Sequence, residues 1–206
     1  MEFISVVELI GTVAFAASGA LIAIEKELDH YGIIFFAIIT AVGGGVIRDM
    51  LINEPLPAAL ANPVYMIVSI VSAVVVILFY RRVVLYSNIL QIFDAIGLAA
   101  FTAIGAEVAI RNNLDLPFVI ITLALLTGTG GGILRDVFAQ EIPFVFRKEI
   151  YAIASIIGAI FFIMIGELTG NNTVALYSCF VITLVIRLVC MKKDVHLKKV
   201  AKGSTS

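Results

Sequence analysis

The chain has 206 residues, of which 61% are hydrophobic and only 14% are charged, and its mean hydropathy is +1.10. A water-soluble domain is roughly 45–50% apolar and about 25% charged, so this composition excludes an ordinary soluble globular protein and favours the lipid bilayer as solvent. The formal net charge of -1 indicates no particular class of charged partner.

Seven apolar stretches are long enough to cross a bilayer, which takes about 20 residues in a helix. The predicted spans are residues 4–24, 32–52, 63–80, 90–110, 117–138, 149–168 and 173–191. The chain opens with Met1-Glu2-Phe3, which is acidic where a cleaved signal peptide is basic, so we expect the first span to remain. The fold class that follows is an all-α polytopic membrane protein with seven transmembrane helices.

Basic residues predict the orientation of these spans, because they gather on the cytoplasmic side. Seven spans place 12 of them, Arg135 and Arg187 included, on the side of the carboxyl terminus, against Arg48 and Arg111 on the other side. We therefore expect a multi-pass protein of the cell inner (plasma) membrane, with its amino terminus outside and its carboxyl terminus cytoplasmic.

An internal repeat relates the two halves of the chain. The motif Gly-Gly-Gly-x-x-Arg-Asp occurs within residues 41–49 and again within 128–136, at an offset of 87, and Glu8 matches Asp94 at an offset of 86. Each unit holds three spans, an odd number, so the second unit must enter the membrane upside down. Inverted repeats of this kind place ion or substrate sites near the midplane, on interrupted helices.

The repeat divides the chain into four parts. They are a first three-helix repeat (1–85), a second and inverted three-helix repeat (86–170), a seventh transmembrane helix (171–191) and a basic cytoplasmic tail (192–206).

The glycine triplets Gly43-Gly44-Gly45 and Gly130-Gly131-Gly132 are the strongest local signal. Each glycine costs about 1 kcal/mol relative to alanine inside a helix, which predicts a break in the second and fifth spans. Main-chain groups uncovered by a break must be satisfied by protein or by a water-filled cavity. The alternative is that the glycines only allow two helices to approach closely.

Charged residues at membrane depth are the second signal, because they are expensive there and usually have partners. The candidates are Arg48, Asp49, Arg135, Asp136, Glu8 and Asp94. We predict that Glu8 and Arg48 flank an outer vestibule, and that Asp94 and Arg135 flank an inner one. The alternative for the arginines is that they reach out to lipid headgroups.

Hydroxyl groups near the triplets could line a polar path, or could bond their own backbone or a neighbouring helix. They belong to Ser18, Thr40, Thr102, Thr127 and Thr129. The cysteines Cys179 and Cys190 lie roughly 16 Å apart on one helix, at about 1.5 Å per residue, so they cannot pair. We find no metal-ligand spacing, nucleotide-binding loop or nucleophile with a base, and we expect no enzyme activity and no metal site.

The paired Gly-Gly-Gly-x-x-Arg-Asp motifs in a seven-span chain of this size resemble the prokaryotic branch of the trimeric intracellular cation (TRIC) channel family, whose bacterial members are also labelled glycine transporters. The resemblance covers roughly residues 4–190. It implies a homotrimer in which each subunit has its own pore, lined by the second and fifth helices and kinked at the glycine triplets. It also places Arg48 and Arg135 at the pore or at its lipid-contacting wall.

The resemblance further implies a passive monovalent cation channel, chiefly permeable to potassium. Its partners would be membrane lipid and two further copies of the chain, with no nucleic acid and no cofactor apart from the permeant potassium and bound lipid. An alternative function is a small secondary transporter for glycine or another small solute, because inverted repeats are also transporter architecture. A structural or lipid-binding membrane protein is a third.

Overall fold

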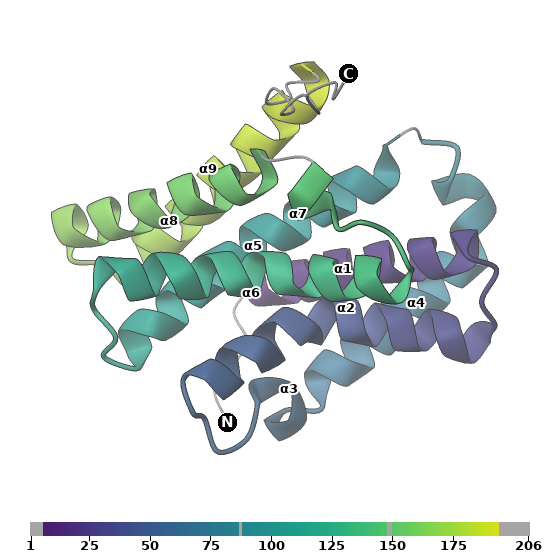
Figure 1. Ribbon diagram of the computed structural model, residues 1–206, viewed down its shortest axis with the longest axis horizontal. Coiled ribbons are helices and arrows are strands. Elements are labelled where there is room, and N and C mark those ends of the chain that lie inside the picture. Colours follow the sequence, from purple (N-terminus) through teal and green to yellow (C-terminus); the bar gives the residue numbers. More distant parts are fainter. Residues whose placement is uncertain (1–5, 87, 148–149, 194–206) are drawn as a thin grey trace, which may run out of the picture.

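The computed structural model describes residues 6–86, 88–147 and 150–193, and all regular secondary structure in these ranges is helical (Figure 1). Within these ranges, seven helices are long and apolar enough to cross a membrane. They are α1 (Val6–Glu25), α2 (His30–Leu51), α4 (Val64–Val83), α5 (Ile89–Arg111), α6 (Pro117–Phe138), α8 (Ile150–Thr169) and α9 (Asn172–Lys193). The seven predicted spans are therefore confirmed, with ends that differ by a few residues.

Two short helices were not predicted. They are α3 (Ala58–Ala61) and α7 (Phe144–Arg147), and each follows one of the glycine-containing helices, α2 and α6. The predicted tail, residues 192–206, lies outside the described residues except for Lys192 and Lys193, which end α9.

The helices of the two halves end in the same way. Glu27 after α1 and Asn113 after α5 adopt a left-handed conformation, with φ of 56° and 57°. Asn53 after α2 and Gln140 after α6 do the same, with φ of 59° and 58°. A left-handed residue after a helix lets the following N–H groups return to the last carbonyls. The matching turns show that the repeat extends from sequence to local backbone geometry.

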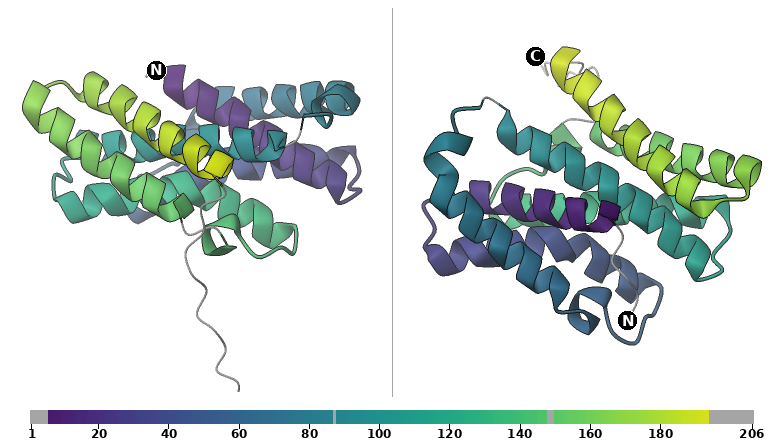
Figure 2. Two further views of the ribbon diagram at one scale, coloured as in Figure 1. Left: turned by 90° about the horizontal axis from the view of Figure 1, so that it is seen from above. Right: turned by 180° about the vertical axis from the view of Figure 1, so that it is seen from behind.

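Helices α1 and α5 form the buried centre of the molecule, and they pack on each other. Helix α1 also contacts α2 and α4, and α5 makes the equivalent contacts with α6 and α8. The two halves further meet where α2 packs on α6. Helix α9 lies beside α8 and packs on α5 (Figures 1 and 2).

Both glycine-containing helices are continuous through their triplets, so the predicted break in each is wrong. A Cβ atom on Gly44 would overlap the carbonyl oxygen of Thr127, and a Cβ atom on Gly131 would overlap that of Thr40. The glycines therefore allow α2 and α6 to cross with their backbones in contact, which was the alternative interpretation.

The energies explain why the helices stay intact. Three glycines cost a helix about 3 kcal/mol in total relative to alanine. Main-chain groups left without partners in an apolar environment cost several kcal/mol each. Keeping the hydrogen-bond ladder is therefore cheaper than breaking it, and the close crossing of α2 and α6 adds dispersion contacts.

Candidate functional site: two buried charged clusters

The first charged cluster consists of Glu8, Arg48, Asp49 and Tyr65. The Arg48 Nε atom donates to Asp49 Oδ1 over 2.8 Å, and both residues are less than 5% exposed. The Tyr65 hydroxyl donates to Glu8 Oε1 over 2.6 Å. The second Asp49 oxygen accepts the backbone N–H of Ala58, at the start of α3, over 2.8 Å. All four side chains line a cavity of about 20 Å³, which has room for about one water molecule.

The second charged cluster consists of Asp94, Arg135, Asp136 and Tyr151. Arg135 is fully buried, with Nη1 2.8 Å from Asp94 Oδ1 and Nε 2.8 Å from Asp136 Oδ1. The Tyr151 hydroxyl donates to the same Asp94 oxygen over 3.3 Å. The other Asp136 oxygen accepts the backbone N–H of Phe144, at the start of α7, over 2.8 Å.

The charged residues of both clusters thus have partners, as predicted. Glu8 and Arg48 line one cavity, and Asp94 pairs directly with Arg135. The alternative that the two arginines reach lipid headgroups is wrong, because both are buried against carboxylates. The short helices have a clear local role, since each supplies a backbone N–H to the aspartate of the motif.

The two tyrosines were not predicted from the sequence. Tyr65 and Tyr151 lie 86 residues apart, the same offset that relates Glu8 to Asp94, and each donates to the acid of its own cluster. Extending the repeat alignment by one helix would have found them. The two clusters therefore correspond residue by residue.

The second charged cluster has additional members. Ser18, from α1, accepts a hydrogen bond of 3.0 Å from Arg135 Nη1, and the Phe144 ring centroid lies 5.7 Å from the Arg135 guanidinium carbon. Arg187, from α9, lies over the Tyr151 ring at 4.6 Å. Arg187 is only 3% exposed, so it is a buried residue of the helix bundle and not a residue of the membrane surface.

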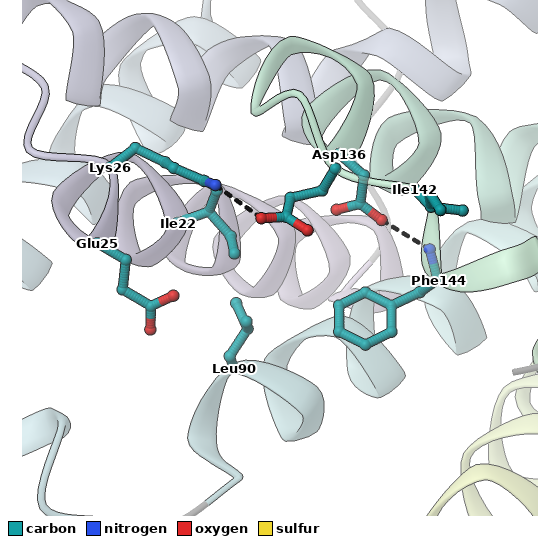
Figure 3. A pocket seen from close by; sticks show the side chains of 8 residues that line it. Ile22, Glu25, Lys26, Leu90, Asp136, Ile142 and Phe144 are labelled. Carbon is teal, nitrogen blue, oxygen red and sulfur yellow. Dashed lines mark hydrogen bonds and ion pairs between the residues drawn. The ribbon is translucent and has the colours of Figure 1, made fainter. Parts of the chain in front are cut away.

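A larger cavity adjoins the second charged cluster (Figure 3). It has a volume of about 300 Å³, and it is lined by Ile22, Glu25, Lys26, Leu90, Asp136, Glu141, Ile142 and Phe144. An ion pair of 2.7 Å joins Lys26 to Glu141, and both side chains are about 40% exposed. Asp136 belongs to both the cavity and the cluster, and it connects the buried charges to this opening.

The remaining predicted hydroxyls bond within the helix bundle. Thr40, Thr127 and Thr129 each donate to the carbonyl four residues earlier, over 2.5 to 2.8 Å. Thr102 donates to Ser155 of α8 over 2.9 Å. This outcome matches the alternative interpretation for these four. Ser18 likewise donates to the carbonyl of Phe15, over 2.9 Å, and it also accepts from Arg135 in the second charged cluster. Among the described residues, no group of three or more His, Cys, Asp or Glu side chains could hold a metal ion.

Comparison with known proteins agrees with this architecture. A family model described as "Glycine transporter" matches the chain twice, at residues 5–81 and 91–167, so that each match covers one three-helix unit. The membrane protein YvgT of Bacillus subtilis is 39% identical over 181 residues, which cover 87% of this chain and 88% of the relative. A UPF0126 membrane protein of Vibrio cholerae is 38% identical over 192 residues, which cover 93% of this chain and 80% of the relative.

Solved structures show the same fold. A structure that explains conductance through TRIC cation channels matches with a TM-score of 0.88 and 31% identity, over 97% of this chain and 98% of that one. The TRIC orthologue from Rhodobacter sphaeroides matches with a TM-score of 0.86 and 30% identity, over 92% of this chain and 97% of that one. This multi-pass membrane protein therefore belongs to the family that the glycine transporter model describes and that includes the prokaryotic TRIC channels.

Proposed function

We propose that this chain is a passive monovalent cation channel, chiefly permeable to potassium. The observation that carries the proposal is the full-length similarity to proteins named TRIC cation channels, at TM-scores of 0.86 to 0.88 and 30–31% identity. A third similar protein, at a TM-score of 0.85, is a prokaryotic TRIC channel crystallised in 0.5 M KCl. The chain is not an enzyme on this account.

The route for the ion runs along α2 and α6, the second and fifth spans, with one charged cluster toward each end. Supporting this route, the two helices carry both Arg-Asp pairs and cross between the clusters. In the described conformation the route is closed where Gly44 and Gly131 bring the backbones together. Conduction then requires α2 and α6 to separate. Glycines suit such a contact, because the nearest atoms that a Cβ on Gly44 would meet across it all belong to the main chain.

The two halves of the chain, residues 1–85 and 86–170, are inverted repeats in this proposal, and α9 is an addition to them. Reciprocal contacts support this arrangement. Gly44 meets Thr127 while Gly131 meets Thr40, and each pair is related to the other by the offset of 87. Phe15 and Phe101, 86 residues apart, stack on each other with ring centroids 5.4 Å apart. A two-fold axis between the halves would generate both kinds of contact.

Arginines beside a cation route need compensation, and the clusters supply it. Asp49 holds Arg48, while Asp94 and Asp136 hold Arg135, so neither guanidinium presents an uncompensated positive charge. Because both arginines are neutralised, selectivity in the open channel rests on carboxylates, hydroxyls and main-chain carbonyls that replace the hydration of the ion.

The orientation proposed from sequence becomes stronger once buried arginines are set aside. Without Arg48, Arg135 and Arg187, ten basic residues remain on the carboxyl-terminal side and one, Arg111, on the other. The second charged cluster and its 300 Å³ cavity then face the cytoplasm, and the amino terminus faces outside. The inner (plasma) membrane location belongs to the same proposal.

A homotrimer surrounded by lipid completes the proposed assembly. The Rhodobacter sphaeroides relative is named a trimeric channel. Outward-facing side chains of α4 and α9 are apolar, with Val71 55%, Leu78 72% and Val185 51% exposed, which suits contact with lipid or with another subunit.

A secondary transporter for glycine or another small solute is the second candidate. The description of the family model favours it. Two cavities separated by a closed crossing also fit alternating access, in which one repeat rocks against the other. The two candidates differ in how flux depends on concentration.

Flux measurements in proteoliposomes distinguish the candidates. A channel should pass potassium passively, with flux that rises without saturation and with no effect of glycine. Arg48→Ala and Arg135→Ala should change this flux, because each leaves buried carboxylates without their counter-charge, whereas Leu78→Ala on the exposed face of α4 should not. Saturable exchange of glycine, with no passive potassium flux, would replace the channel by the carrier.

A further inference from the structure

Helix α9 is an addition to the three-helix pattern, because the seven spanning helices of the described residues leave it without a counterpart. It packs on α8 and α5, the two helices that supply Tyr151 and Asp94. From α9, Arg187 enters the bundle with only 3% of its surface exposed. Its guanidinium carbon lies 4.6 Å from the centroid of the Tyr151 ring.

Arg187 interacts with Tyr151 through its charge as well as through packing. A guanidinium over an aromatic face is attracted to the ring, and the attraction is stronger where water is excluded. Among the described residues, the Nε atom of Arg187 has no hydrogen-bond partner. Little water or salt screens the charge of a buried cation. The electric field of Arg187 therefore reaches the neighbouring charged groups with little attenuation.

Arg187 makes the two charged clusters electrostatically unequal. The first has two carboxylates, Glu8 and Asp49, against the single guanidinium of Arg48. The second has two carboxylates against the guanidinium of Arg135, and α9 places a second guanidinium behind Tyr151. Among these buried groups, the first charged cluster therefore has one negative charge in excess, whereas the charges of the second charged cluster and Arg187 balance. The Lys26–Glu141 ion pair at that end adds no net charge, and Glu25 is exposed to solvent.

We infer that Arg187 controls how readily cations enter from the end that holds the second charged cluster, and so sets the current rectification of each pore. The inference rests on the proposed channel function. The fixed positive charge lowers the local concentration of cations at that end. Removing it should raise entry from that end and leave entry from the first charged cluster nearly unchanged.

Three variants separate the charge of Arg187 from its shape. Arg187→Met keeps an unbranched side chain of similar length but loses the charge, and Arg187→Gln does so with a polar end, in case the methionine variant does not fold. Arg187→Lys keeps the charge and loses the planar group that stacks on the ring. Arg82→Met is the matched control, because it removes one positive charge from an exposed position at the end of α4, on the same side of the membrane.

Single-channel currents in inside-out patches from giant spheroplasts, with equal KCl on both sides, give the test with known sidedness. The quantity measured is the ratio of two currents at opposite voltages: that of cations entering from the cytoplasmic side, and that of cations entering from the outer side. This ratio should rise about twofold or more in Arg187→Met or Arg187→Gln. The ratio should stay at the wild-type value in Arg187→Lys and in Arg82→Met.

An unchanged ratio in both neutral variants, with conducting wild type, would overturn the inference and leave the channel proposal intact. A lysine variant that shifts as far as the neutral ones would also overturn it, since shape and not charge would then be responsible. A wild type that carries no current in patches and no passive flux in vesicles would instead refute the channel proposal itself, and the inference with it.

Discussion

Replacing Gly44 by alanine tests the role of the glycine triplets directly. The new Cβ atom would overlap the carbonyl oxygen of Thr127 and lie 3.2 Å from the backbone nitrogen of Gly131. Both neighbours are backbone atoms, so the helices α2 and α6 must separate by on the order of 1 Å to reach ordinary contact. Overpacking of this kind costs about 1–3 kcal/mol, against a gain of about 1 kcal/mol from the better helix former.

The expected net change for Gly44→Ala is therefore a loss of up to about 2 kcal/mol. For a chain of this size a loss at the upper end of that range lowers the unfolding temperature by about 4–8 °C, measurable by thermal unfolding of the purified protein in detergent. Gly45→Ala is the matched control in the same triplet, because its Cβ atom would meet only Arg48 Nη2, at 3.8 Å. It should be neutral or stabilising by up to about 1 kcal/mol. Equal destabilisation by the two changes would refute the crossing explanation and restore a requirement for a broken helix.

Three further changes separate buried contacts from exposed ones. Asp94→Asn should cost about 1.5–3 kcal/mol in the same assay, because it leaves the buried guanidinium of Arg135 with only one of its two carboxylate partners, Asp136. A cost below about 1 kcal/mol would contradict a buried pair. Thr102→Val should cost about 1–3 kcal/mol by leaving Ser155 without its donor, and adding Ser155→Ala should recover part of that loss. Lys26→Gln should cost less than about 1 kcal/mol, because its ion pair is half exposed, and its difference from wild type should vanish at high salt.

The spanning helices could be predicted from sequence because apolar length alone specifies them. Residues 117–138, for example, were expected as a span and form α6 between the same limits. The buried charges could be predicted for a related reason, since Arg135 and Asp94 can lie at membrane depth only with partners.

The behaviour of the glycine triplets could not be predicted, because it depends on what lies opposite them. Helix propensity shows the cost of Gly131 but not the backbone of α2 that fills the space beside it. The burial of Arg187 could not be predicted either. Near the end of an apolar span it has the same sequence signal as an arginine at the membrane surface, and only the fold shows that it lies over the Tyr151 ring.

Recording from purified protein in planar bilayers under a potassium gradient tests the central claim most directly. The account predicts discrete current steps that reverse near the potassium equilibrium potential and shrink when sodium replaces potassium. Silent bilayers, from preparations that exchange glycine saturably in vesicles, would contradict it.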